Sequence, residues 1–241
     1  MKKIICLICC RGGSKNIKDK NIRNFAGKPL LAWILKEAIK SKIFDKIILS
    51  TDSKKIAKVG KKYGILIPGL RPRKLALSNS NQFDTHKYIF KKLNINDKNS
   101  IVCNLLNNPF INSHLIKKSF KVFKKFDFKR IVVDYTKVDS DYIALKQFSI
   151  NKNDKIKLLN PKKFLKLKLN RQELKNYYVF IHNIRWGLPS DLIDYEIFKK
   201  NLLKNGYGIK LSKLENFDLD DMEDWIIAKN LFKLLKKIKK N

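Results

Sequence analysis

Apolar runs alternate along the chain with segments whose apolar residues recur every three or four positions. Runs of the first kind predict buried strands, and segments of the second kind predict helices that cover them. The predicted strands fall at 2–9, 46–50, 65–67, 100–106 and 130–135, and the predicted helices at 29–42, 53–64, 82–93 and 113–126. Such alternation implies right-handed crossovers and a mostly parallel sheet with helices on both faces. We therefore expect an α/β fold.

The alternation breaks between about 137 and 176, where the sequence is rich in Lys and Asn. We interpret 137–176 as an inserted or protruding element within a single domain of residues 1–241. Beyond it, the pattern predicts a strand at 177–186, a helix at 190–203 capped by Ser190, a strand at 207–212 and a final amphipathic helix at about 221–239. Open α/β sheets bind ligands at the carboxyl ends of their strands, so polar residues directly after the strands are candidates for a site.

The composition is typical of a globular protein. Of the 241 residues 44% are hydrophobic, while 9 Gly and 6 Pro exclude collagen-like and Gly/Pro-rich classes. No stretch approaches the roughly 18 apolar residues of a membrane helix. The apolar run at the N-terminus ends at Arg11 without a cleavage pattern. The four cysteines lack metal-ligand spacing on a strand, so we expect small core thiols in a cytoplasmic protein.

The charge balance is unusual, because 54 Lys and Arg against 21 Asp and Glu give a net charge of +33. Such a surface would attract nucleic acid, an anionic membrane or an anionic substrate. The alternative is compositional drift toward Lys with no partner selected for. Only seven of the basic residues are Arg, the residue with which proteins read guanine bases. We therefore expect neither a nucleic-acid partner nor a membrane partner.

A loop rich in glycine and basic residues follows the first predicted strand directly. Gly12 and Gly13 would let the backbone adopt positive φ and approach a ligand closely. Successive N–H groups then form an anion-binding concavity. The loop also supplies three cations and a hydroxyl donor that are able to bind a polyphosphate: Arg11, Lys15, Lys20 and Ser14. The spacing is neither the Walker pattern nor the dinucleotide pattern.

The same loop resembles the signature R-G-G-S-K-x-I-x-x-K-N of the acylneuraminate cytidylyltransferase family, which includes the pseudaminic and legionaminic acid enzymes. All eight fixed positions are present, as Arg11, Gly12, Gly13, Ser14, Lys15, Ile17, Lys20 and Asn21. The resemblance continues at 26–30, 49–53, 63–64 and 70–72 and covers roughly the first 80 residues. It implies a Rossmann-like nucleotidyltransferase fold (GT-A-like) with a small protruding dimerisation element.

The resemblance also implies which residues contact CTP. The implied contacts are Arg11, Ser14, Lys15, Lys20 and Asn21 of the loop, its two glycines, and Arg71. Ser80 is a looser candidate, because Asn81 stands where the family often has Ser.

An acidic cluster near the C-terminus is one of few in this basic chain. Asp218 and Asp220 are two residues apart, so on an extended segment both carboxylates reach one hard cation. The alternative is helix capping, which we assign to Asp221 with Glu223 and Asp224. The motif is similar to the family's D-I-D-[ST]-x-x-D. That likeness implies that Asp218 and Asp220 bind Mg²⁺ (or Mn²⁺).

The resemblance weakens at positions that border the sugar in the family. After the fourth strand the family often reads Q-P-T-S-P-L-R, whereas this chain has Leu105 at the Gln position and Ile111 at the Arg position. Further on, Ile181 and His182 stand where the family has N-G. Nucleotide chemistry therefore looks intact, while recognition of the acceptor is altered.

The resemblance implies that the protein transfers CMP from CTP to the anomeric hydroxyl of an acidic 2-keto sugar and releases pyrophosphate. In this hypothesis Arg11, Lys15 and Lys20 stabilise charge on the phosphates, Asp218 and Asp220 hold the metal, and the element at 137–176 forms a homodimer. Two other hypotheses stay open: a catalytically impaired relative that binds a nucleotide or an anionic glycan, and a basic nucleic-acid-binding protein.

Overall fold

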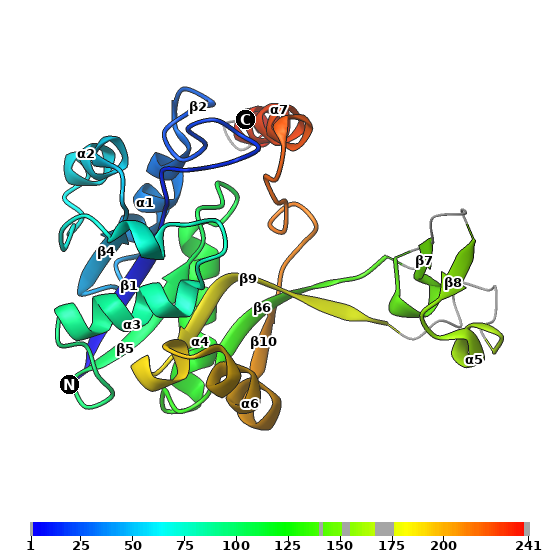
Figure 1. Cartoon of the computed structure of the whole chain (residues 1–241). Coiled ribbons are helices and arrows are strands. Elements are labelled where there is room, and N and C mark those ends of the chain that lie inside the picture. The colour runs from blue at the N-terminus through cyan, green and yellow to red at the C-terminus, as the bar shows by residue number, and fades with distance from the viewer. Residues whose placement is uncertain (1, 140–141, 151–154, 167–175, 239–241) are drawn as a thin grey trace.

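The computed structural model describes residues 2–139, 142–150, 155–166 and 176–238 (Figure 1). Its body is built on a six-stranded sheet in the order β10-β6-β9-β5-β1-β4. The strands are β1 (Lys3–Cys9), β4 (Lys46–Ser50), β5 (Ser100–Leu105), β6 (Val132–Lys137), β9 (Tyr178–Gly187) and β10 (Tyr207–Lys210). Neighbouring strands pair in parallel except β9, which runs antiparallel to both β5 and β6. The predicted α/β fold with a mostly parallel sheet is confirmed.

Helices cover both faces of this sheet, and its strand β1 is apolar on both sides. Cys6 and Ile8 of β1 belong to one buried cluster, and Ile5 and Leu7 belong to another. The first cluster includes residues of α1 (Leu30–Ser41), α2 (Lys54–Lys62) and α4 (Ser113–Lys125). The second includes residues of α3 (Gln82–Lys92) and α6 (Tyr195–Asn205). Among the described residues, no helix is both long and apolar enough to cross a membrane.

The last helix, α7 (Met222–Ile238), packs on the N-terminal part of the chain (Figure 1). Trp225 and Phe232 of α7 share a third buried cluster with Ile17, Phe25 and Trp33. The ring of Phe25 meets that of Trp225 edge to face at 5.2 Å. Because Ile17 lies in the loop after β1, this cluster fixes that loop against the segment that leads into α7.

Two short predictions are wrong in detail. Residues 65–67 form no strand, and only a single bridge joins Leu66 to Ile48. The helix predicted at 190–203 is split into a 3₁₀ turn, Pro189–Leu192, and α6. The cap of α6 is Asp194, whose carboxylate accepts the N–H of Ile197 at 2.9 Å. Ser190 does not cap this helix, because its hydroxyl donates to Asp97 at 2.6 Å.

An arm stands apart from the body at the end of the long β6 and β9 strands (Figure 1). Its described parts include the hairpin of β7 (Phe148–Ile150) and β8 (Ile156–Leu158) and the short α5 (Pro161–Phe164). Residues 140–141, 151–154 and 167–175 of the element predicted at 137–176 lie outside the described residues. Several apolar side chains of the arm are exposed: Tyr142, Phe148, Ile150, Ile156, Leu159 and Leu165.

Candidate active site

A cavity of about 240 Å³ lies at the carboxyl ends of β1 and β5, where segments far apart in the sequence meet. The loop after β1 forms part of its lining. The loop after β5, the strand β9 and the segment before α7 form the rest. The polar side chains that line it are Arg11, Ser14, Lys20, Asn21, Asn107, Asn108, Asn183 and Asp218. Five predicted site residues are therefore brought together: Arg11, Ser14, Lys20, Asn21 and Asp218. An anionic ligand there faces cations, hydroxyl and amide donors, and one carboxylate.

The loop after β1 is held by hydrogen bonds to three neighbouring segments. The Cys10 N–H donates to the Ser50 carbonyl oxygen at 3.0 Å, and the Gly12 N–H donates to Asp52 Oδ1 at 2.9 Å. Asn21 Nδ2 donates to the Arg11 carbonyl oxygen at 2.9 Å and so closes the loop on itself. The cations of the loop are thus held on a fixed backbone.

Glycine is required in this loop for a different reason from the predicted one. The prediction of positive φ at Gly12 and Gly13 is wrong, because neither residue has it. A Cβ added to Gly12 would lie 3.0 Å from the Cβ of Ser53, whereas one added to Gly13 meets no atom within 4 Å. Gly12 therefore permits close packing of the loop against the segment after β4.

We predict that Gly12→Ala destabilises the fold and Gly13→Ala does not. The alanine methyl at position 12 must displace Ser53 or the loop, and such overpacking costs about 1–3 kcal/mol. Thermal unfolding should show a melting temperature lower by a few degrees for Gly12→Ala, and by less than about 2 °C for Gly13→Ala. Equal melting temperatures for the two variants would contradict the packing explanation.

The two predicted metal ligands flank a buried leucine beside the loop. Leu219 is buried, while Asp218 and Asp220 on either side of it are exposed. The ammonium group of Lys20 donates to the Leu219 carbonyl oxygen and so ties the loop to this acidic segment. The carboxylate of Asp218 raises the pKa of Asp220 above its ordinary value, partial burial adds to this, and the Lys20 ammonium opposes it.

The two carboxylates are near enough to repel one another, and a hard divalent cation bound there would relieve that repulsion. Mg²⁺ is commonly bound through one or two carboxylates together with water and substrate phosphates. Nowhere in the described part of the chain do three potential ligand side chains of the His, Cys, Asp or Glu type come together around a metal position. The arrangement therefore fits a metal whose remaining ligands come from the nucleotide and water.

The other acidic residues of the cluster cap α7, as expected. Asp221 Oδ1 accepts the Asp224 N–H at 2.9 Å, and Asp224 Oδ2 accepts the N–H groups of Asp220 at 2.9 Å and Asp221 at 3.3 Å. This reciprocal pair is the carboxylate form of a capping box. The capping bonds therefore leave the carboxylates of Asp218 and Asp220, the two predicted metal ligands, outside the reciprocal cap.

Five of the predicted nucleotide contacts do not line the cavity: Gly12, Gly13, Lys15, Arg71 and Ser80. Lys15 is exposed on the loop. Arg71 is buried behind the loop, where its guanidinium donates to Thr85 Oγ1 at 3.3 Å and lies 3.8 Å from Asp52, the acceptor of the Gly12 N–H. The hydroxyl of Ser80 donates to the carbonyl oxygens of two leucines in its own turn, and Arg11 donates to the second of these. Arg71 and Ser80 thus share a partner each with the loop: Asp52 with Gly12, and the Leu77 carbonyl oxygen with Arg11.

Residues 5–216 match the family described as cytidylyltransferase. The chain belongs to this family. It is therefore an enzyme of the nucleotidyltransferase class. Pseudaminic acid cytidylyltransferase of Campylobacter jejuni is 27% identical over 235 residues, which cover 96% of this chain and 97% of the relative. CMP-N,N'-diacetyllegionaminic acid synthase of Legionella pneumophila is 28% identical over 239 residues, with the same two coverages.

Solved structures share the fold of this cytidylyltransferase at low sequence identity. CMP:2-keto-3-deoxy-manno-octonic acid synthetase complexed with CTP has a TM-score of 0.67 and 11% identity, covering 97% of this chain and 99% of that chain. 4-Diphosphocytidyl-2C-methyl-D-erythritol synthase of Anaerococcus prevotii has a TM-score of 0.61 and 17% identity, covering 96% and 99%. These likenesses confirm the predicted Rossmann-like nucleotidyltransferase fold.

The structure explains the two replacements at the loop after β5. Leu105 and Ile111 are both fully buried in the main core of the cytidylyltransferase, so neither borders the cavity. The polar residues that do border it from this loop are Asn107 and Asn108, and from β9 Asn183. Sequence reasoning missed all three. Their place directly after a strand was a usable signal for the first two, but nothing in the sequence marked Asn183.

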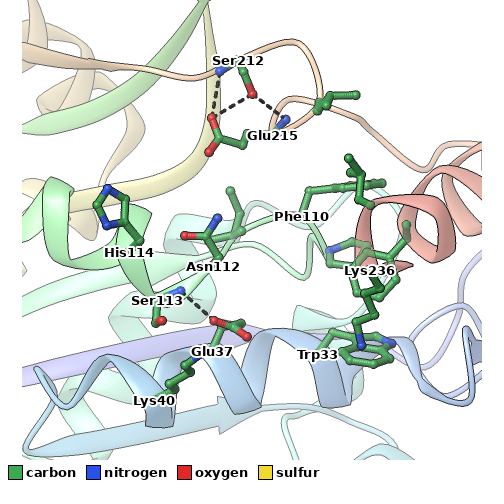
Figure 2. A pocket seen from close by; sticks show the side chains of 15 residues that line it. Trp33, Glu37, Lys40, Phe110, Asn112, Ser113, His114, Ser212, Glu215 and Lys236 are labelled. Carbon is green, nitrogen blue, oxygen red and sulfur yellow. Dashed lines mark hydrogen bonds between the residues drawn. The ribbon is translucent and has the colours of Figure 1, made fainter. Parts of the chain in front are cut away.

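A larger cavity of about 630 Å³ lies between α1, the start of α4 and α7, on the far side of the β5–α4 loop (Figure 2). Its two carboxylates are already engaged, because Glu37 accepts the Ser113 N–H at 2.8 Å and Glu215 accepts the Ser212 N–H at 2.9 Å. The Lys236 ammonium lies 3.4 Å from the centre of the Trp33 ring. Ile111 lines this cavity, but none of the residues predicted to contact CTP or a metal does, so size alone does not locate the chemistry.

Proposed function

We propose that this cytidylyltransferase transfers CMP from CTP to the anomeric hydroxyl of an acidic 2-keto sugar and releases pyrophosphate. One observation carries the proposal: the cationic loop after β1 and the carboxylate segment before α7 meet at the same cavity. Binding of a polyphosphate needs the cationic loop, and binding of a divalent cation needs the carboxylates. The names of the relatives, which refer to pseudaminic and legionaminic acids and to N-acylneuraminate, support this class of acceptor.

Each site residue has a role in this reaction. Arg11, Ser14 and Asn21 hold the phosphates from the cavity wall, the backbone of Gly12 and Gly13 shapes the loop, and Lys15 engages the triphosphate from the rim. The anomeric oxygen bonds to the α-phosphorus while the bond from that phosphorus to pyrophosphate breaks, and solvent takes the hydroxyl proton. Lys20 stabilises charge on the phosphates. Such transfers depend on positioning and charge neutralisation more than on covalent catalysis.

Asp218 and Asp220 would hold Mg²⁺ or Mn²⁺ in this scheme. The bound metal would neutralise phosphate charge as pyrophosphate leaves. The closeness of the two carboxylates, whose repulsion raises the pKa of Asp220, and the neighbouring ammonium of Lys20 support this assignment.

A coupled pyrophosphate assay with CTP, Mg²⁺ and a panel of acidic 2-keto sugars tests the function. We expect pyrophosphate release that needs both the sugar and CTP. Binding of CTP without turnover on any sugar of the panel would favour the hypothesis of a catalytically impaired relative. That hypothesis is based on Leu105 and Ile111, which stand where the family often has Gln and Arg. Salt-dependent retention on DNA without turnover would favour the nucleic-acid hypothesis, which rests on the +33 charge.

We also propose that the enzyme is a cytoplasmic homodimer joined through its arm. The exposed apolar side chains of the arm support an interface there, since contiguous exposed apolar surface marks sites of association. Four cysteines without disulfides suit a reducing compartment. The mass in solution, measured by light scattering, tests the dimer.

A further inference from the structure

Two asparagine side chains in the cavity have polar atoms without a partner among the described residues. Asn183 is 6% exposed, and its Nδ2 makes no hydrogen bond. Asn107 uses its Nδ2 to donate to Asn21 Oδ1 at 2.8 Å, but its buried Oδ1 accepts nothing. Both side chains line the cavity. Buried polar atoms are rarely left unpaired in native proteins, so this pair of atoms points to a ligand.

The orientation of Asn107 follows from a relay of donors. The Arg11 carbonyl oxygen can only accept, so Asn21 must present its Nδ2 to it and its Oδ1 to Asn107. Asn107 must then donate with Nδ2, which leaves its Oδ1 as an acceptor. The cavity therefore offers one amide acceptor, from Asn107, and one amide donor, from Asn183.

The amide acceptor of Asn107 and the amide donor of Asn183 do not suit a phosphate, which is the group that the loop after β1 suits. Phosphate oxygens only accept hydrogen bonds, so they leave the Asn107 oxygen unpaired. A hydroxyl group or an acylamino group both donates and accepts, so it satisfies both atoms. Neither amide carries a charge, which also sets this pair apart from the cations Arg11 and Lys20.

The backbone places the two asparagines side by side. The Leu106 N–H, next to Asn107, donates to the Asn183 carbonyl oxygen at 2.9 Å. On its other side Asn183 is held by the fully buried Asp134, which accepts the N–H of Asn183 at 3.0 Å and of Ile184 at 3.1 Å. The register of β6 and β9 shifts next to Asp134.

The residue before Asn183 is strained. His182 has φ of 66°, which is a left-handed conformation. This conformation is energetically unfavourable for any residue that carries a Cβ. Strained backbone of this kind persists where the surrounding structure enforces it, and it clusters at ligand sites. Burial raises the pKa of Asp134 to about 6, and the N–H groups that donate to its carboxylate oppose this rise. The carboxylate that holds Asn183 is therefore mostly ionised at neutral pH.

We propose that Asn107 and Asn183 form an amide clamp that binds a neutral substituent of the acceptor sugar, a hydroxyl or acylamino group. The clamp takes the role left open by Leu105 and Ile111, which are buried away from the cavity. This inference rests on the proposed function, because it assigns the acceptor side of the same cavity.

The test compares steady-state kinetics of Asn183→Ala, Asn107→Ala and the wild-type enzyme. Loss of one hydrogen bond to the sugar should raise the KM for the sugar about 10-fold in both variants. The KM for CTP should change less than about 2-fold in Asn183→Ala, whereas Asn107→Ala also removes the bond to Asn21, so a rise in its KM for CTP is expected as well. Asn183→Asp, which keeps the shape and removes the donor, should show the same split as Asn183→Ala. Asn230→Ala, exposed on α7, is the matched control and should resemble wild type. Circular dichroism confirms that each variant is folded.

The outcomes separate this inference from the proposed function. A wild-type enzyme inactive on every sugar of the panel refutes the function itself. An active wild type with folded variants of unchanged sugar KM overturns the clamp, and so does a rise confined to the KM for CTP, which would assign the amides to the ribose. If the penalty appears only with acylamino sugars, the clamped group is an amide; if it also appears with sugars bearing hydroxyls alone, the group is a hydroxyl.

Discussion

Replacing Asp220 by asparagine is expected to lower kcat by about 100-fold or more while the fold survives. Asp220 carries its charge close to Asp218, and that repulsion raises the pKa of Asp220. In the proposed mechanism, Asp218 and Asp220 contribute to the reaction only when a divalent cation and the triphosphate are both bound. Asparagine keeps the size of the side chain and removes the charge, so the proposed hold of Asp218 and Asp220 on a divalent cation would weaken. Pyrophosphate release in the coupled assay measures the effect.

The exposed Glu223, on the first turn of α7, provides the control for this prediction. Glu223→Gln removes the same charge from the same short segment but lies outside the proposed metal site, so its kcat should stay within about 2-fold of wild type. Near-normal turnover by Asp220→Asn would remove Asp220 from the mechanism. Raising the Mg²⁺ concentration should recover part of the activity of Asp220→Asn if metal affinity is what the variant has lost.

Most of the fold was predictable because it rests on local patterns. The strand β1 is apolar at every position that the sheet buries, and the helices around it show their apolar faces in the spacing of residues. The helix boundaries of α3 and α4 follow from Asn81 and Asn112, whose side chains accept the N–H groups of the first turn. Such signals act within a few residues, and sequence displays them directly.

Features that depend on contacts between distant residues were not predictable in the same way. The split before α6 arises because Ser190 bonds to Asp97, 93 residues away, while Asp194 is left to cap the helix. The antiparallel pairing of β9 with β6, and the register shift beside Asp134, to which the Asn183 N–H donates, join residues that are far apart in the sequence. No periodicity in either segment carries this information.

The candidate site divides in the same way. The loop motif around Arg11 and the acidic pair that includes Asp218 are both legible in the sequence, and each forms a wall of the cavity. Asn107 follows a predicted strand, but Asn183 and its pairing with Asn107 stand out only in three dimensions, where their segments meet and one amide atom of each lacks a partner. The reason for glycine at position 12 also differs from the predicted one, since its N–H donates to Asp52 and its Cα lies close to Ser53. Arg71 lies 3.8 Å from the same Asp52.

Lys20→Met is expected to lower kcat by about 100-fold or more, with a smaller effect on the affinity for CTP. The ammonium of Lys20 lines the cavity, donates to the Leu219 carbonyl oxygen and lies close enough to Asp220 to oppose the rise of its pKa. It is therefore the one cation of the loop that touches the acidic segment in the described part of the chain. There it can stabilise charge on the phosphates during transfer, when that charge is redistributed.

Methionine keeps most of the length of the side chain and removes the charge, so the variant separates electrostatics from packing. Lys18→Met is the matched control, because Lys18 is exposed in the same loop and lines no part of the cavity; its kcat should stay within about 2-fold of wild type. A purely structural role, through the bond to Leu219, would lower the melting temperature and leave kcat nearly unchanged. A catalytic role lowers kcat in a folded enzyme whose Kd for CTP, measured by calorimetry, rises by less than about 10-fold. Turnover of Lys20→Met equal to that of Lys18→Met would show that charge at this position does not act on the reacting phosphates.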